Sequence, residues 1–171
     1  MFSILEAVPF SIFLAYIRSI DTSVPANWKG PFLAAGLAAA MVMGILVYRK
    51  KTMNRIFLGM NLYLATGALA FLTGMWWVNN MYDTLQASGV LLWVIGVGIA
   101  TTLASPAGFL GVASPDKRKA RTYSVYFLAA SVCAFLISLG FRGTILFSEI
   151  IPFMGLFMVQ AALKARLSPE K

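Results

Sequence analysis

The chain has 171 residues, of which 60% are hydrophobic and only 12% are charged, and its formal net charge is +8. A soluble domain carries about 25% charged residues, so this composition excludes an ordinary water-soluble domain. In a soluble protein the positive charge would suggest nucleic acid as a partner. Here the positions of the charges favour a different interpretation, membrane topology.

Long apolar stretches occupy most of the chain. The six stretches are Phe2–Ile20, Pro31–Tyr48, Ile56–Val78, Leu85–Leu103, Ser124–Phe141 and Thr144–Leu163. A bilayer core requires about 20 residues in a helix, whereas barrel strands are about 10 residues long and alternate polar with apolar. The stretches do not alternate. We therefore predict an all-α fold, a single transmembrane domain over residues 1–171 in which six transmembrane helices form one bundle.

Most of the basic residues fall into alternate gaps between the stretches. They are Arg49, Lys50, Lys51 and Arg55, then Lys117, Arg118, Lys119 and Arg121, and finally Lys164, Arg166 and Lys171. The positive-inside rule places such gaps in the cytoplasm. This pattern predicts a multi-pass protein of the bacterial inner (plasma) membrane with both termini cytoplasmic. The outer connections are then Asp21–Gly30, Asn79–Thr84 and a tight turn at Arg142 and Gly143.

Small residues fill the segment that follows the fourth stretch. Pro106 and Pro115 bracket Ser105–Ser114, which predicts that the fourth helix ends near Ser105 and that the segment leads to a basic loop. The alternative is that Gly108 and Gly111 allow a short interfacial or re-entrant piece to form.

Small residues also recur at helical spacing within the stretches. The positions are Gly36, Ala40 and Gly44, then Ala70 and Gly74, then Gly96 and Ala100, with Ala104 continuing the last series. Small residues four apart share one face and let helices approach closely, because helix association in lipid depends on packing. We interpret them as internal packing positions, with a homodimer interface as the alternative.

The residue types needed for most catalysis are missing. The chain has no histidine and a single cysteine, Cys133, and no acidic pair clusters within the stretches. Histidine is the usual catalytic base and the commonest metal ligand. We therefore expect no enzymatic activity, no cofactor and no metal. The expected partners are the lipid bilayer and other membrane proteins, or a second copy of the chain, and not nucleic acid.

Ionisable residues within membrane helices are the usual indication of function. Glu149 lies about five residues into the last stretch, and Gln160 follows eleven residues later, at nearly the same azimuth. Glu149, Phe153, Leu156 and Gln160 therefore form one stripe along the helix, which is polar at both ends. Pro152 lies beside the glutamate and can free a backbone carbonyl there.

Two interpretations of Glu149 remain open. Its carboxylate either responds to protons or cations in a cavity, or pairs with Arg142 or Lys29 near the outer surface. Arg142 is itself a binding candidate, because an anchoring arginine can contact an anionic headgroup.

One buried neutral polar residue is also a candidate. Asn61 lies within the third stretch, where an interhelical hydrogen bond or a ligand contact would explain it. The threonines Thr66, Thr73, Thr101 and Thr102 can bond to the backbone of their own helix.

Three segments resemble the bacterial intracellular septation protein A family. The run from Pro9 to Asp21, PFSIFLAYIRSID, resembles the opening of that family. The second helix ending in Tyr48-Arg49-Lys50 is similar, as is Phe141-Arg142-Gly143-Thr144 before a final helix that contains proline. The resemblance implies an inner-membrane protein linked to envelope synthesis and division that acts through protein contacts, with no catalytic residues.

The sequence thus predicts a non-enzymatic interaction or envelope-maintenance component, or a subunit of a larger membrane complex. The alternative is a small transporter, a substrate-capturing subunit or a lipid-handling protein that uses Glu149 in an intramembrane cavity.

Overall fold

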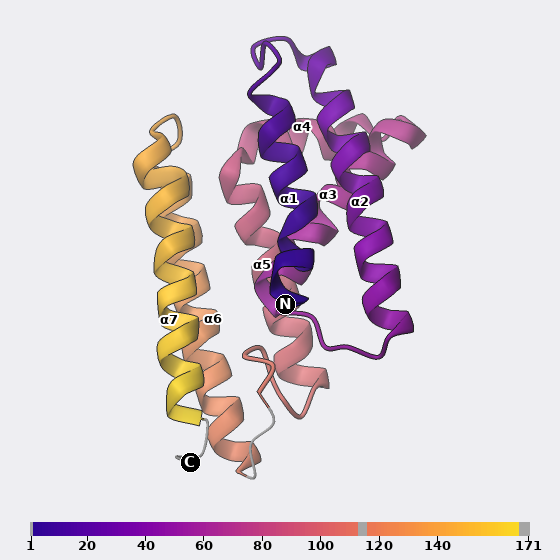
Figure 1. The fold of residues 1–171 in the computed structure, drawn as a ribbon. Coiled ribbons are helices and arrows are strands. Elements are labelled where there is room, and N and C mark those ends of the chain that lie inside the picture. The colour runs from indigo at the N-terminus through magenta and orange to yellow at the C-terminus, as the bar shows by residue number, and fades with distance from the viewer. Residues whose placement is uncertain (1, 113–115, 168–171) are drawn as a thin grey trace. The chain divides into compact units, whose positions relative to one another are not determined.

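The computed structural model describes residues 2–112 and 116–167, and every regular element in these ranges is helical (Figure 1). In chain order the elements are α1 (Phe2–Ile17), η1 (Pro25–Trp28), α2 (Lys29–Tyr48), α3 (Arg55–Thr73), α4 (Trp76–Leu85), α5 (Ala87–Ala104), α6 (Lys117–Gly140), η2 (Leu146–Ile150) and α7 (Ile151–Leu167). The all-α prediction is confirmed. The end of the predicted Ser105–Ser114 segment and the predicted cytoplasmic Lys171 lie outside the described residues.

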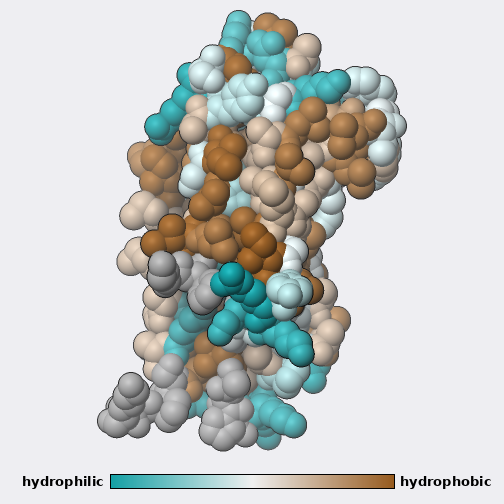
Figure 2. Space-filling model, turned by 45° about the vertical axis from the view of Figure 1, so that its right-hand side comes forward, coloured by the Kyte–Doolittle hydropathy of each residue, from teal (hydrophilic) through white to brown (hydrophobic). Residues whose placement is uncertain are grey.

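Within the described residues, five helical segments are long and apolar enough to cross a membrane. They are Pro25–Tyr48, Arg55–Thr73, Ala87–Ala104, Lys117–Gly140 and Leu146–Leu167, and α1 is a shorter apolar helix. Large apolar side chains such as Leu72, Leu103 and Met158 are exposed on these helices. Figure 2 shows broad hydrophobic areas in brown, with hydrophilic residues gathered toward the upper and lower parts of that face. Such surfaces are rare on soluble monomers and are compatible with a multi-pass membrane protein.

The predicted helix at 56–78 is wrong at its carboxyl end. The structure ends α3 at Thr73, and Gly74 follows with a φ of 71°, in the left-handed region. Glycine adopts this conformation without steric cost and therefore commonly ends helices. The chain then begins a new helix, α4, at Trp76. The predicted outer connection at Asn79–Thr84 is consequently helical.

The helix predicted at 124–141 begins earlier than expected, at Lys117. Asp116 precedes it in an extended conformation, and its carboxylate accepts a hydrogen bond from the Lys119 backbone N–H at 3.0 Å. An aspartate in this position satisfies one of the free N–H groups of the first turn. Charged residues can therefore occupy the first turns of α6, which an apolar pattern alone does not reveal.

The chain divides into two compact units, Met1–Thr84 and Leu85–Lys171, where the sequence predicts one bundle. In the first unit, α2 packs against α1 and α3. Its aromatic core brings together Phe32, Tyr63 and Tyr82, with the two tyrosine ring centroids 4.3 Å apart. The Tyr82 hydroxyl also lies 2.6 Å from Thr66 Oγ1, so α4 is held against α3.

In the second unit, α6 packs against both α5 and α7, and Figure 1 shows α6 and α7 side by side. The buried face of α6 repeats every three or four residues. Its members are Ala120, Ser124, Phe127, Ser131, Ala134 and Ser138. After α5, a turn segment places Phe109 in the core, where its ring lies 4.5 Å from that of Phe127. This segment forms one wall of the site described below.

Candidate functional site

Glu149 lies in the π-helical η2 and is exposed. Gln160 on α7 is buried, with 4% of its surface exposed. Glu149 therefore does not share the buried face with Gln160, as the predicted stripe requires. At that end of the helix the buried residues are Ser148 and Pro152. A π-helical turn contains more residues than an α-helical turn, so it changes which residues face inward.

The carboxylate of Glu149 forms no hydrogen bond or ion pair with any described residue, so the pairing with Arg142 is not formed. Arg142 lies in the turn between α6 and η2, where its Nε donates to the Leu139 carbonyl at 3.2 Å. The structure thus places Glu149, Gln160 and Arg142 in three different environments and does not bring them together.

The carbonyl beside Pro152 has a partner that the sequence analysis missed. Proline has no N–H to donate to the carbonyl four residues earlier, which is that of Ser148. The Ser138 hydroxyl of α6 donates to this carbonyl at 2.6 Å. The contact ties the start of the last helix to α6.

Asn61 takes part in a different polar cluster, in the first unit. Its Nδ2 donates to the backbone carbonyl of Glu6 at 3.1 Å, and its Oδ1 is buried without a hydrogen-bond partner among the described residues. The Glu6 carboxylate, which is also buried, accepts from the Asn54 backbone N–H at 3.1 Å. Asn54 caps α3, and its side chain accepts from the Ile56 N–H. Asn61 therefore connects α3 to α1 through an interhelical hydrogen bond.

Sequence reasoning missed Glu6 as a member of this cluster, although two signals were present. Asn54 stands directly before a helix, where an asparagine typically acts as a cap. Pro9 interrupts the backbone bonding of α1 close to Glu6. Both features create polar backbone groups that need partners.

The small residues of α2 and α3 divide into packed and exposed positions. Gly36 is in close contact with α3: an added Cβ would lie 2.3 Å from Ala68 Cβ and 2.9 Å from the Leu64 carbonyl oxygen. Ala70 is also buried, with 1% of its surface exposed. Ala40 and Gly44 are exposed, and Gly74 ends α3.

All three small residues of α5 at this spacing are exposed. Gly96, Ala100 and Ala104 lie on one face of the helix, and a Cβ added at Gly96 would have no described atom within 4 Å. The small residue that packs inside the unit is Gly98, where an added Cβ would lie 2.7 Å from the Phe109 ring. The α5 face is therefore open.

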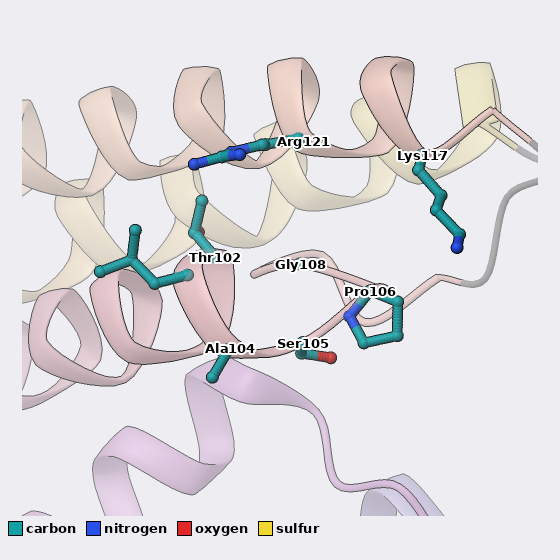
Figure 3. A pocket seen from close by; sticks show the side chains of 8 residues that line it. Thr102, Ala104, Ser105, Pro106, Gly108, Lys117 and Arg121 are labelled. Carbon is teal, nitrogen blue, oxygen red and sulfur yellow. The ribbon is translucent and has the colours of Figure 1, made fainter.

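A pocket of about 200 Å³ lies between the end of α5 and the start of α6. Its wall is made by Thr102, Leu103, Ala104, Ser105, Pro106, Gly108, Lys117 and Arg121. Figure 3 shows the Arg121 side chain of α6 lying toward Thr102 of α5, and the Lys117 side chain extending toward the turn at Pro106. Among the described residues, the pocket is thus lined by two cationic groups and two hydroxyl groups, and by no carboxylate.

Within residues 2–112 and 116–167, no group of three or more His, Cys, Asp or Glu side chains could hold a metal ion. Comparison of the chain with protein-family models, with curated proteins and with solved structures finds no match.

Proposed function

We propose that the chain is a non-enzymatic, multi-pass component of the bacterial inner membrane that acts by associating with other membrane proteins or with a second copy of itself. An envelope-maintenance role fits the resemblance to the septation protein A family. The observation that carries the proposal is the open face of α5, formed by Gly96, Ala100 and Ala104.

The proposal rests on how helices associate in lipid. Apolar side chains gain nothing by leaving lipid for another helix, so association needs close packing, which small residues at a spacing of four permit. In the first unit Gly36 provides such packing against α3. On α5 the same spacing is present, and none of the described helices of the second unit packs against it.

The proposed topology has six crossings with both termini in the cytoplasm. The five long helices and the shorter apolar α1 supply the crossings, and the basic residues before α3, at the start of α6 and at the end of α7 supply the orientation. Reporter fusions after residues 51, 116 and 171 test it. Each reporter is expected in the cytoplasm, and an external reporter at residue 171 would overturn the topology.

Cysteine cross-linking tests the α5 interface. In a Cys133→Ser background, Ala100→Cys is expected to form a disulfide-linked adduct in membranes, and adding Gly96→Leu is expected to abolish it. Val125→Cys is the matched control, since Val125 is also an exposed apolar position in the second unit. Equal cross-linking from both positions, or none from Ala100→Cys, would contradict the proposal.

A second candidate is a small transporter, a substrate-capturing subunit or a lipid-handling protein that uses Glu149. The observation that favours it is the π-helical turn that holds this unpaired carboxylate, because such turns are frequent at functional sites. Transport or lipid transfer in reconstituted vesicles tests it. Glu149→Gln is expected to abolish flux and its pH response, whereas unchanged flux rejects this candidate.

A further inference from the structure

The pocket between α5 and α6 has a rigid wall. The turn segment after α5 is fixed by Phe109 and Leu110, which are 0% and 1% exposed. Gly108 has a φ of 57°, and an added Cβ would lie 2.1 Å from Ser124 Oγ, so the backbone here lies directly against α6. The pocket is therefore part of the folded unit and does not depend on a ligand to form.

The shielded hydroxyl group of the pocket, that of Thr102, lacks a hydrogen-bond partner among the described residues. Five other threonine hydroxyls in the described helices donate to the carbonyl four residues earlier. They belong to Thr66, Thr73, Thr84, Thr101 and Thr122. Thr102 Oγ1 is shielded from solvent and has no hydrogen bond with any described residue. A shielded polar group without a partner is costly and requires an explanation, and a ligand oxygen would provide one.

The two cations of the pocket are also unneutralised. Lys117 and Arg121 form no ion pair with any described residue, although both line the same pocket, where Figure 3 shows Arg121 lying toward Thr102 and Lys117 toward Pro106. They are four residues apart on α6, so they lie on one face, and like charges at this spacing destabilise a helix. Asp116, the nearest carboxylate in sequence, accepts from the Lys119 N–H and does not line the pocket. An anion bound in the pocket would lessen this repulsion.

From this arrangement we infer that the pocket binds a phosphate group through Lys117, Arg121 and Thr102. Arginine and lysine beside hydroxyl donors are the usual partners of phosphate oxygens. A pocket of about 200 Å³ has room for the group, since each water in the liquid takes about 30 Å³. The pocket lies at the end of the apolar α5, where the headgroup of a membrane lipid would also lie. The source of the phosphate is therefore either a phospholipid headgroup or a soluble phosphate.

Binding of two probes to the purified full-length chain in neutral detergent tests the inference. Isothermal calorimetry is carried out with short-chain phosphatidylglycerol and, separately, with inorganic phosphate. Binding of phosphatidylglycerol that excess inorganic phosphate does not displace identifies a lipid headgroup as the ligand. Binding of inorganic phosphate with equal or higher affinity identifies a soluble phosphate. Absence of binding by both probes overturns the inference.

Matched variants distinguish this pocket from general charge attraction. Lys117→Gln and Arg121→Gln are expected to weaken binding at least about tenfold, because each removes a charge-assisted hydrogen bond. Lys119→Gln and Arg118→Gln remove the same charges from the same turns of α6 outside the pocket, and their affinity is expected to stay within about twofold of wild type. Equal losses in the pocket and control variants overturn the inference.

Thr102→Val gives a test that leaves the net charge and side-chain shape unchanged. It is expected to weaken binding severalfold, whereas Thr101→Val, which removes hydrogen bonds to the Val97 and Gly98 carbonyls of the same helix, is expected to leave binding unchanged. Circular dichroism verifies that each variant is folded. A folded Thr102→Val protein with wild-type affinity removes Thr102 from the site and overturns the inference as stated.

Discussion

The Ser138 hydroxyl donates a 2.6 Å hydrogen bond to the Ser148 carbonyl, the backbone group that Pro152 leaves without its usual helical partner. Pro152 removes a backbone hydrogen bond from the last helix, and the carbonyl that it leaves free bonds to Ser138 of the neighbouring α6. In the first unit, Asn61 of α3 donates to the Glu6 carbonyl of α1, next to the Leu5 carbonyl that Pro9 leaves without its usual helical partner. Each unit thus contains a proline-interrupted helix held by a polar side chain of a neighbouring helix.

Replacing Ser138 by alanine tests the contact in the second unit. Ser138→Ala is expected to lower the free energy of unfolding by about 0.6 kcal/mol, and by no more than about 1.7 kcal/mol, the average and the maximum for hydrogen bonds between membrane helices. The measurement is unfolding in a denaturing detergent, followed by circular dichroism. Ser131→Ala is the control, because the Ser131 hydroxyl bonds within its own helix, to Phe127.

A double-mutant cycle makes this prediction specific. With Pro152→Ala, the backbone N–H of residue 152 becomes available to the Ser148 carbonyl, so Ser138→Ala should cost much less in that background. An equal cost in both backgrounds would show that the serine stabilises the fold for another reason.

The buried Glu6 is expected to act as a hydrogen-bond acceptor. Glu6→Gln keeps an oxygen that can accept from the Asn54 N–H, whereas Glu6→Leu leaves that group without its acceptor. The loss of a partner for a buried donor costs about 1–3 kcal/mol. Thermal unfolding should therefore show Glu6→Leu to be clearly less stable than Glu6→Gln. Equal destabilisation by both variants would argue that the charge is what matters.

Gly36 and Gly44 are expected to respond differently to the same substitution. Gly36→Ala places a Cβ 2.3 Å from Ala68 Cβ and should cost about 1–3 kcal/mol through overpacking. Gly44→Ala meets no described atom within 4 Å and should be neutral or slightly stabilising in a helix. Adding Ala68→Gly should restore part of the stability of Gly36→Ala, and unfolding measurements on the three variants would decide this.

The segment between α1 and η1 is expected to depend on acid pH. Hydrogen bonds from the Ser23 hydroxyl and N–H lower the pKa of the Asp21 carboxyl below its ordinary value of 3.8. A lowered pKa means that the interaction stabilises the segment above the unfolded pKa and is lost as pH falls through the folded pKa. Ser23→Ala should raise the pKa of Asp21, which an NMR titration would detect. An unchanged pKa would contradict the assignment of Ser23 as the cause.

The apolar stretches were sufficient to predict the helical class and most helix positions, since membrane helices require long apolar runs. They could not locate breaks that depend on single backbone conformations. Gly74 ends α3 within the predicted third helix, and Asp116 starts α6 among charged residues. Both are local capping effects, which hydrophobicity does not report.

The candidate site was harder to predict. Its residues differ in character and share no sequence pattern, and only the fold brings them close together. Glu149 is conspicuous in the sequence but lies on an exposed π-helical turn. Lys117 and Arg121 read as topology signals, and only the folded turn after α5 brings them beside Thr102. A missing hydrogen bond, such as that of Thr102, is visible only once every neighbour is placed.

Gly74, which ends α3, also determines how long the apolar helix α3 is. The 19 residues of α3 extend about 28 Å at 1.5 Å per residue, close to the roughly 30 Å thickness of a bilayer core. Without the turn at Gly74, an apolar helix running to Val78 would exceed that thickness and would have to tilt. The length of α3 thereby matches a bilayer of ordinary thickness, and a thicker bilayer should strain α3 together with α5, which has 18 residues.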